Sequence, residues 1–317
     1  MALTAHFDLE LHQMDVKIAF LYGRLDEDIY MVQPPGFVER GKEHLVCKLN
    51  KSIYGLKQAS RQWYKRFQSF GFVENKIDNC IYMKQHKSQF IFMVLYVDDI
   101  LLASSHMQLM IETKKMLCNG FDLKYLGEAH YVLGIEIVRN RQNGTLGLSQ
   151  KNYIERVLKR FNTEACSAGD VPIGKGDKFS LSQCPITQHD IRVMMDKPYE
   201  SLVGSVMNAQ VCTRPDLAFA LSVLGRFQSN PGIAHWNAGK KVLRYLKKTQ
   251  DYVLSYHRVQ NLEVVYYSDA DLRGCIDDRM STSGYIFIMA GGCSVMEKQK
   301  ANHKGCFYNG IRIYRMF

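Results

Sequence analysis

The chain has 317 residues, 46% of them hydrophobic, which is enough for two domains, or three small ones, with ordinary cores. Its formal charge of +10 and pI near 9.1 favour a polyanionic partner, either nucleic acid or an anionic membrane surface. No run of about 18 uncharged apolar residues occurs, and the first residues lack the basic start of a signal peptide, so we expect no membrane span and no secretion.

The nine cysteines are scattered singly along the chain. The lack of a C-x-x-C pair argues against a zinc site, and the odd number argues against a disulfide framework. We therefore expect reduced, mostly buried thiols in an intracellular protein.

The pattern of the amino-terminal residues predicts a strand, then a segment without regular structure, and then a helix. Residues 14–21, "MDVKIAFL", predict a strand that runs into a turn at Tyr22 and Gly23. The paired prolines of "MVQPPGF" break regular structure. Residues 57–70 have helical spacing. The apolar face of this helix holds Ala59, Trp63, Phe67 and Phe70, while Lys57, Arg61, Lys65 and Arg66 lie off that face.

Residues 90–104, "FIFMVLYVDDILLAS", form an apolar run that two adjacent carboxylates, Asp98 and Asp99, divide at its centre. The pattern predicts two strands joined by a turn. Two interpretations stay open at this point, because the aspartates are either ordinary solvated turn residues or part of a site.

The middle of the chain predicts a helix over about 107–118, followed by a hairpin at Asn143-Gly144 between two runs of strand character. Residues 151–161 return to helical spacing. The polar, Gly-containing stretch 162–190 is the best candidate for a linker.

Two helices and two strands are expected beyond it. The first helix begins at Pro215 and turns four apolar residues inward, namely Leu217, Leu221, Leu224 and Phe227. The second helix, "HWNAGKKVLRYLKKT", carries Lys240, Lys241, Arg244, Lys247 and Lys248. "EVVYYSDADLRG" and "SGYIFIMAGG" are typical of strands in a third unit, and the last residues show no clear period.

The acids of two expected strands suggest chemistry. Asp15 lies on the first strand, and Asp98 and Asp99 follow 83 residues later. If these strands are neighbours in one sheet, three carboxylates converge, and binding of divalent cations relieves their repulsion. Oxygen ligands suit magnesium, and two such ions about 4 Å apart are the basis of two-metal phosphoryl transfer.

Six blocks, in chain order, resemble the reverse transcriptase segment of a copia-type LTR retrotransposon polyprotein. They are "MDVKIAFLYGRLDEDIYMVQPPGF", "LNKSIYGLKQASRQWY", "LYVDDILLA", "YLGEAHYVLGIEI", "CTRPDLAFALSVLGRF" and "HWNAGKKVLRYLKKT". "YYSDADLRGCIDDRMSTSGYIF" is similar to the start of an RNase H domain. The resemblance extends to about residue 292.

The resemblance implies an α/β (α+β) fold, a polymerase palm with an antiparallel sheet and helices. Residues 1–165 would be the palm with truncated fingers and the start of the thumb. Residues 166–255 would be a helical thumb and connection, and 256–317 a partial RNase H-like fold with an aberrant tail.

The resemblance also implies roles for individual residues. Asp15, Asp98 and Asp99 are the catalytic triad, and Asp15, Asp98 and the Val16 carbonyl bind two Mg²⁺ ions, for which Mn²⁺ can substitute. The implied nucleotide and template contacts are Phe20 (which blocks a ribose 2′-hydroxyl), Tyr54, Gly55, Lys57 and Tyr96. Gly134 corresponds to the primer grip and Asp269 to the first metal-binding acid of RNase H.

Several of these roles have a structural alternative. Phe20 fits core packing, Gly134 fits a β-bulge, and Asp269 fits a lone strand acid. The basic helices at 57–66 and 240–248 fit a template–primer track, or equally a solvated charged face. Ser60 stands where the family usually has proline.

The implied function is RNA-directed DNA polymerisation, a nucleotidyl transfer with an RNA template, a DNA primer and deoxynucleoside triphosphates as partners. The oligomeric state is open, and the location is the cytoplasm, in virus-like particles, or the nucleus. Relatives carry fingers strands before "LELHQMDV" and further RNase H acids after Gly292, so we expect a truncated copy without RNase H activity. The alternatives are an inactive remnant that at most binds nucleic acid, and an unrelated magnesium phosphotransferase.

Overall fold

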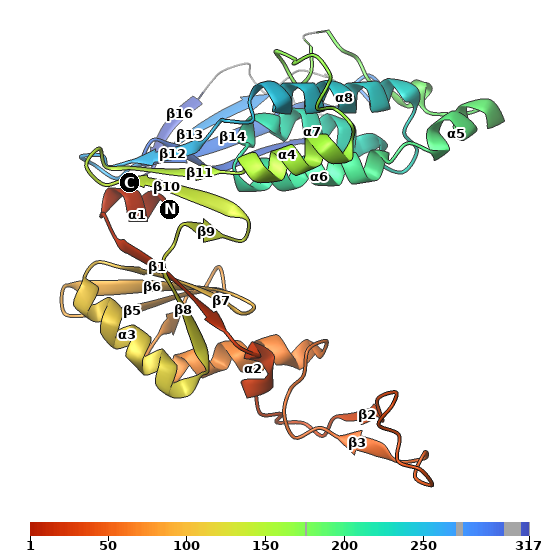
Figure 1. Ribbon diagram of the computed structural model, residues 1–317. Coiled ribbons are helices and arrows are strands. Elements are labelled where there is room, and N and C mark those ends of the chain that lie inside the picture. The colour runs from red at the N-terminus through yellow and green to blue at the C-terminus, as the bar shows by residue number, and fades with distance from the viewer. Residues whose placement is uncertain (175, 271–274, 301–311, 317) are drawn as a thin grey trace. The chain divides into compact units, whose positions relative to one another are not determined.

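The computed structural model describes residues 1–174, 176–270, 275–300 and 312–316. The chain is a mixed α/β protein with antiparallel sheets, and eight α-helices lie in the described part (Figure 1). It divides into two compact units: unit 1 comprises residues 1–6 and 130–317, and unit 2 comprises residues 7–129. None of the helices within the described ranges has the length and apolar character needed to span a membrane.

Unit 2 is built on a six-stranded antiparallel sheet with the order β4-β5-β6-β7-β1-β8. Its strands are β1 (Glu10–Val16), β4 (Val73–Glu74), β5 (Ile81–His86), β6 (Gln89–Tyr96), β7 (Asp99–Ser104) and β8 (Leu123–Glu128). The predicted hairpin around the two aspartates is confirmed as β6 and β7. The first strand of the unit, β1, lies between β7 and β8, which come much later in the chain.

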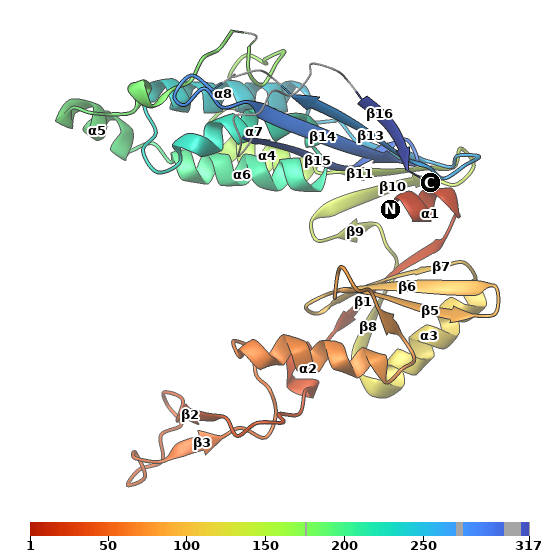
Figure 2. The ribbon, with the colours of Figure 1, turned by 180° about the vertical axis from the view of Figure 1, so that it is seen from behind.

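Helices α2 (Lys57–Gln68) and α3 (Met107–Gly120) cover one face of this sheet (Figures 1 and 2). Alternate strand residues such as Met14 and Ile100 pack against Trp63 and Phe67 of α2, so the core lies between the sheet and the helices. The predicted helices over 57–70 and 107–118 are therefore confirmed, as is the inward face of the first. The intervening residues of β1 and β7 lie on the opposite face, which no helix of unit 2 covers in the described part.

The predicted strand over residues 14–21 is wrong in its second half. β1 ends at Val16, because Ile18 takes a left-handed backbone (φ 55°, ψ 44°) and residues Ala19–Tyr22 form a 3₁₀ helix, η1. The Lys17 amide donates to the Asp122 carbonyl at 3.0 Å, and the Leu21 amide donates to the Ile18 carbonyl at 2.9 Å. The left-handed residue and the 3₁₀ turn end the strand at Val16, one residue after Asp15.

An arm follows η1, with a small ladder between β2 (Tyr30–Val32) and β3 (Val46–Lys48). The paired prolines come directly after β2, where regular structure ends as expected. The arm exposes large apolar side chains, including Val32 and Phe37, and it leads back into α2.

Unit 1 contains two four-stranded sheets and a group of helices. One sheet has the order β12-β11-β10-β9, and the other has the order β15-β14-β13-β16. The strands of the first are β9 (Tyr131–Val132), β10 (Ile135–Asn140), β11 (Thr145–Ser149) and β12 (Leu254–His257), and those of the second are β13 (Val264–Ala270), β14 (Thr282–Met289), β15 (Gly292–Lys300) and β16 (Arg312–Met316). The hairpin predicted at Asn143-Gly144 is confirmed as β10 and β11.

The helices of unit 1 are α1 (Ala2–His6), α4 (Lys151–Arg160), α5 (Gln188–Met195), α6 (Tyr199–Cys212), α7 (Ala218–Leu224) and α8 (Ile233–Lys248), with 3₁₀ turns η2 (Leu181–Gln183), η3 (Pro215–Leu217) and η4 (Gly225–Phe227). Four of them, α4, α6, α7 and α8, contribute to one apolar core. The helix expected from Pro215 is present as η3, α7 and η4 in succession, and its four predicted inward residues are buried. The core members that α4, α6 and α8 contribute include Ile154, Leu202 and Leu243.

The segment 162–190, predicted as a linker, instead belongs to unit 1. Its first part lies along α8, where the Gly169 amide donates to the Arg244 carbonyl at 3.0 Å. Lys241 pairs with Asp177 at 3.0 Å, and Arg244 donates to the Ser167 carbonyl at 2.7 Å. The polar composition of this segment therefore reflects bonds to a basic helix rather than a free connection.

Two further expectations need correction. The tail without a clear period contributes two strands, β15 and β16, to the second sheet of unit 1. All eight cysteines that the structure describes are free thiols, but only Cys275 is buried, so the expectation of mostly buried thiols is wrong.

Candidate active site on the open face of the unit 2 sheet

Asp15 and Asp99 lie directly opposite each other on neighbouring antiparallel strands. Residues in such a pair point to the same face of the sheet, here the face opposite α2 and α3. Tyr96 is paired with Asp99 in the hairpin of β6 and β7, so Tyr96, Asp99 and Asp15 form a row across β6, β7 and β1. The predicted adjacency of the two acid-bearing strands is thereby confirmed.

Asp98 belongs to the two-residue turn between β6 and β7. Its main-chain carbonyl accepts a hydrogen bond from the Val16 amide at 2.8 Å, which ties the turn to the end of β1. Val97, the other turn residue, has a left-handed backbone with φ of 52°. A β-branched residue is costly in this conformation, and such strain is concentrated at functional sites in proteins.

Two neutral side chains hold the adjacent carboxylates. The Tyr54 hydroxyl donates to Asp98 Oδ1 at 2.8 Å, and the Gln13 amide donates to Asp99 Oδ1 at 2.9 Å. Burial raises the pKa of Tyr54, and its hydrogen bond to Asp98 raises it further, while the main-chain amides of Phe20 and Ala19 act in the opposite direction. Tyr54 therefore keeps its proton at neutral pH and remains a donor.

No cation of the described chain is paired with any of the three acids. Asp15 is half-buried and makes no hydrogen bond or ion pair with a described residue, although the exposed Lys124 lies opposite it on β8. By contrast, Asp122 of the same unit is paired with Lys17 at 3.1 Å. The three acids thus lie at the end of β1, in the adjoining turn and at the start of β7, and no described cation is paired with them.

The donor set fits a hard divalent cation, because it consists of carboxylate oxygens and the adjoining Val16 carbonyl. The predicted convergence of all three side chains is not seen, however. Among the described residues no three His, Cys, Asp or Glu side chains are grouped so that they could hold a metal ion.

Among the other predicted nucleotide contacts, Tyr54 bonds to Asp98 and Phe20 lies against Tyr54. The half-buried Phe20 is part of η1, and its ring centroid lies 4.9 Å from that of Tyr54. Phe20 also packs against the unit 2 core, so its alternative role in packing is real as well. Gly55 has a left-handed backbone with φ of 95°, and Lys57 is the exposed first residue of α2.

Gly134 and Asp269 belong to unit 1. Gly134 and Leu133 form the two-residue turn between β9 and β10, and both have positive φ, as a type I′ turn requires. Gly134 is thus a hairpin turn residue and not a bulge. Asp269 is exposed on β13, opposite Gly284 of β14.

The two basic helices differ in how far their cations are already engaged. On α8, Lys247 donates to the Cys166 carbonyl at 2.7 Å and Lys248 pairs with Asp170, in addition to the contacts of Lys241 and Arg244 with the same segment. Only Lys240 of that row makes no hydrogen bond or ion pair with a described residue. On α2, Lys57 and Arg61 are exposed and likewise without such a partner in the described chain.

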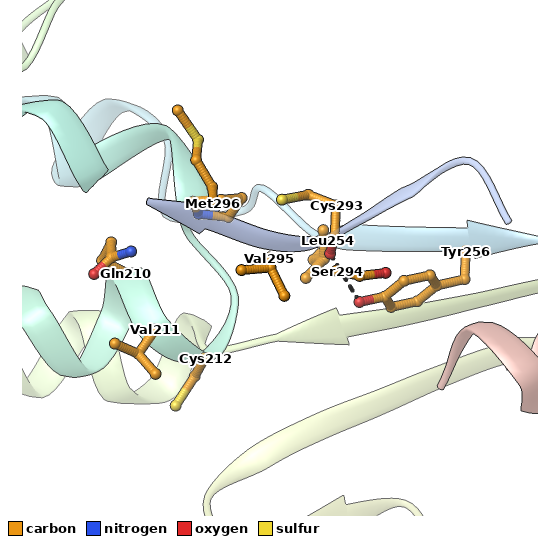
Figure 3. Close-up of a pocket in the computed structure, with 10 residues that line it drawn as sticks. Gln210, Val211, Cys212, Leu254, Tyr256, Cys293, Ser294, Val295 and Met296 are labelled. Carbon is orange, nitrogen blue, oxygen red and sulfur yellow. Dashed lines mark hydrogen bonds between the residues drawn. The ribbon is translucent and has the colours of Figure 1, made fainter. Parts of the chain in front are cut away.

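Unit 1 contains a separate cavity of about 290 Å³ between the end of α6, β12 and β15 (Figure 3). Its lining includes Cys212, Cys293 and Tyr256, whose hydroxyl donates to the Cys293 carbonyl at 3.0 Å. Burial raises the pKa of both thiols, so neither is an activated nucleophile. This cavity offers no acid–base pair, and the open face of unit 2 remains the candidate active site.

Comparison with known proteins shows which family the chain belongs to. The family described as "Reverse transcriptase (RNA-dependent DNA polymerase)" matches residues 1–175. The chain is 46% identical over 297 residues to the Retrovirus-related Pol polyprotein from transposon TNT 1-94 of Nicotiana tabacum, and that match covers 92% of this chain and 22% of the relative. A Pol polyprotein from transposon RE2 of Arabidopsis thaliana is 38% identical, over 87% of this chain and 19% of the relative.

The chain thus spans about a fifth of the length of these two relatives. A third relative is of similar size: the putative transposon Ty5-1 protein of Saccharomyces cerevisiae is 30% identical over 88% of this chain and 89% of its own length. The family match includes Asp15, Asp98 and Asp99 within its range. The chain therefore belongs to the reverse transcriptase (RNA-dependent DNA polymerase) family and is similar to part of the Pol polyproteins of copia-type retrotransposons.

Proposed function

We propose that unit 2 is the palm of an RNA-directed DNA polymerase and that its open sheet face carries the reaction. The observation that supports this most directly is the row of Asp15 and Asp99, with Asp98 in the adjoining turn, none of them paired with a cation. In this reaction a primer 3′-hydroxyl attacks the α-phosphate of a deoxynucleoside triphosphate, and pyrophosphate leaves. The helices of residues 166–255 and the strands of residues 256–317 would then serve as thumb or connection and as an RNase H-like fragment.

Asp15, Asp98 and the Val16 carbonyl would hold the divalent cations that reverse transcriptases generally use, here Mg²⁺. When bound, such ions lower the pKa of the attacking hydroxyl and offset charge on the phosphate. The protein's own part is to fix the acids on adjacent strands, because a displaced ligand loses catalysis steeply. Phe20 and Tyr54 would form the wall against which the sugar of the incoming nucleotide rests.

Contacts to the nucleic acid backbone are proposed for α2 rather than for α8. Lys57 and Arg61 are exposed and unpaired in the described chain, whereas most cations of α8 are already engaged by residues 164–177. Phosphate contacts by Lys and Arg supply affinity that does not depend on sequence and weakens with salt.

Primer extension on an RNA template with Mg²⁺ tests the proposal. Asp98→Asn keeps the shape of the side chain and an acceptor for Tyr54 but removes a charged ligand. We expect extension to fall at least about 100-fold, the usual effect of losing one transition-state contact. Asp122→Asn is the matched control, since it removes an acid of unit 2 that is paired with Lys17 outside the row.

Equal extension by the wild type and Asp98→Asn would contradict the proposed site. If the wild type shows no extension but binds a primer–template duplex with affinity that falls as salt rises, the chain is a nucleic-acid-binding remnant without catalysis.

A further inference from the structure

Tyr54 lies in the loop before α2 and contacts the acid site on two sides. Its hydroxyl donates to Asp98 Oδ1 at 2.8 Å, while its ring lies against Phe20 at a centroid distance of 4.9 Å and an angle of 56°. Tyr54 therefore touches both the turn that carries Asp98 and the 3₁₀ helix that follows Asp15.

The position of Tyr54 is set by Ser52. The Ser52 amide donates to the Gly23 carbonyl at 2.9 Å, and its hydroxyl donates to the Phe20 carbonyl. Ser52 is fully buried, and a methyl group added at Gly23 would lie only 2.6 Å from its Oγ. The close fit at Gly23 anchors the loop before α2 to η1, so the reach of Tyr54 toward Asp98 does not depend on a flexible segment.

We propose that Tyr54 is a positioning residue that orients Asp98 for metal binding and links this orientation to Phe20. This inference rests on the proposed function, because it concerns the same acid site. A carboxylate accepts up to about four hydrogen bonds, so the bond at Oδ1 leaves the second oxygen of Asp98 available to a cation. Because Tyr54 is neutral, it fixes the carboxylate without cancelling its charge. An Arg or Lys at this position would cancel that charge.

The presence of three acids does not by itself explain what holds Asp98 in the orientation that metal binding needs. Groups that hydrogen-bond to a metal ligand hold that ligand in its productive orientation, and their loss commonly weakens metal binding 10- to 100-fold. The Tyr54 ring also contacts Phe20, which is proposed to rest against the sugar of the incoming nucleotide. Movement of Phe20 would therefore change the position of Asp98 through Tyr54. A displaced Phe20 would shift the phenol and loosen Asp98.

Direct measurement of Mn²⁺ binding to the full chain, without nucleic acid, tests the inference. Electron paramagnetic resonance reports the free ion. Tyr54→Phe keeps the ring and its contact with Phe20 and removes only the hydroxyl, and we expect its Mn²⁺ dissociation constant to rise about tenfold. Tyr22→Phe is the matched control, because the Tyr22 hydroxyl accepts from the Asp122 amide at 2.7 Å and touches none of the three acids. That variant should bind Mn²⁺ like the wild type.

Phe20→Leu provides a second, independent measurement. It should weaken Mn²⁺ binding about threefold in the wild-type background and have no further effect in the Tyr54→Phe background, because both changes act through one hydroxyl. Equal effects of Phe20→Leu in both backgrounds would overturn the link between Phe20 and Asp98.

Failure of this inference is distinguishable from failure of the proposed function. If the wild type binds Mn²⁺ and Asp98→Asn does not, but Tyr54→Phe binds as tightly as the wild type, the positioning role is wrong and the acid site stands. If the wild type binds no more Mn²⁺ than Asp98→Asn, the metal site fails and the positioning role fails with it.

Discussion

Two β-branched residues with left-handed backbones flank the acids. Ile18 follows Asp15 at the end of β1, and Val97 precedes Asp98 in the hairpin turn. For L-residues this conformation costs about 1–2 kcal/mol, and the bonds around the site hold it in place. The abrupt end of β1 and the two-residue turn together bring the Val16 amide to the Asp98 carbonyl.

Val97→Asn should relieve this strain, because Asn tolerates the left-handed region better than a β-branched residue. We expect the free energy of unfolding, measured with urea, to rise by about 0.5–1 kcal/mol. Val94→Asn on β6 is the control, since Val94 has an ordinary strand backbone and should lose stability on the same change. A loss of stability in both variants would show that the turn is not strained.

The sequence reveals the acids more readily than their partners. Asp98 and Asp99 interrupt an apolar run and can be recognised without a structure, and so can the strand position of Asp15. Gln13 was missed, because its bond to Asp99 joins residues 86 positions apart and a glutamine carries no local signal. The only sign of it is an amide on a strand two residues before an acid, where it shares a face with that acid.

At the level of elements, residues 164–177 use charge and main-chain carbonyls to cover the basic side of α8. Main-chain carbonyls and two acids of this segment, Asp170 and Asp177, are the acceptors for four cations of α8, namely Lys241, Arg244, Lys247 and Lys248. Helical periodicity predicted α8 correctly, because an apolar stripe is a local signal. It did not predict what the opposite face binds, because that depends on tertiary contacts.

Arg244→Met should release this segment. Arg244 donates to the Ser167 carbonyl at 2.7 Å and to its hydroxyl at 2.6 Å, and the loss of two bonds worth about 1 kcal/mol each favours local opening. We expect subtilisin to cut within residues 163–178 at least about ten times faster. Lys248→Met is the matched control, because its ion pair with Asp170 is exposed and contributes little to stability. Similar cleavage of both variants would contradict the special role of Arg244.

At the scale of the whole molecule, each unit has its own apolar core and its own tryptophan. Trp63 is fully buried in unit 2, and Trp236 packs against the helical core of unit 1. The sequence suggested more than one domain from length alone, but it gave no sign that residues 1–6 join unit 1. The boundaries proposed at residues 165 and 255 stay predictions.

Because the cores are separate, we expect two transitions in guanidinium unfolding, one for each unit. Tryptophan fluorescence of Trp236→Phe should follow unit 2 alone, and that of Trp63→Phe should follow unit 1 alone, since the chain has only two tryptophans. Circular dichroism of the wild type provides the comparison, because it reports both units. Coincident midpoints for all three measurements would mean that the units unfold as one.

The sheet order β7-β1-β8 has a consequence for synthesis on the ribosome. The strand with Asp15 emerges first, yet both of its neighbours are completed only when Glu128 has been translated. At 5–20 residues per second this leaves at least one edge of β1 open for roughly 5–20 s, a period in which a nascent chain is exposed to chaperones and to aggregation. The acid site therefore forms only after β7 has been made, and a ribosome that stalls before Asp99 leaves it incomplete.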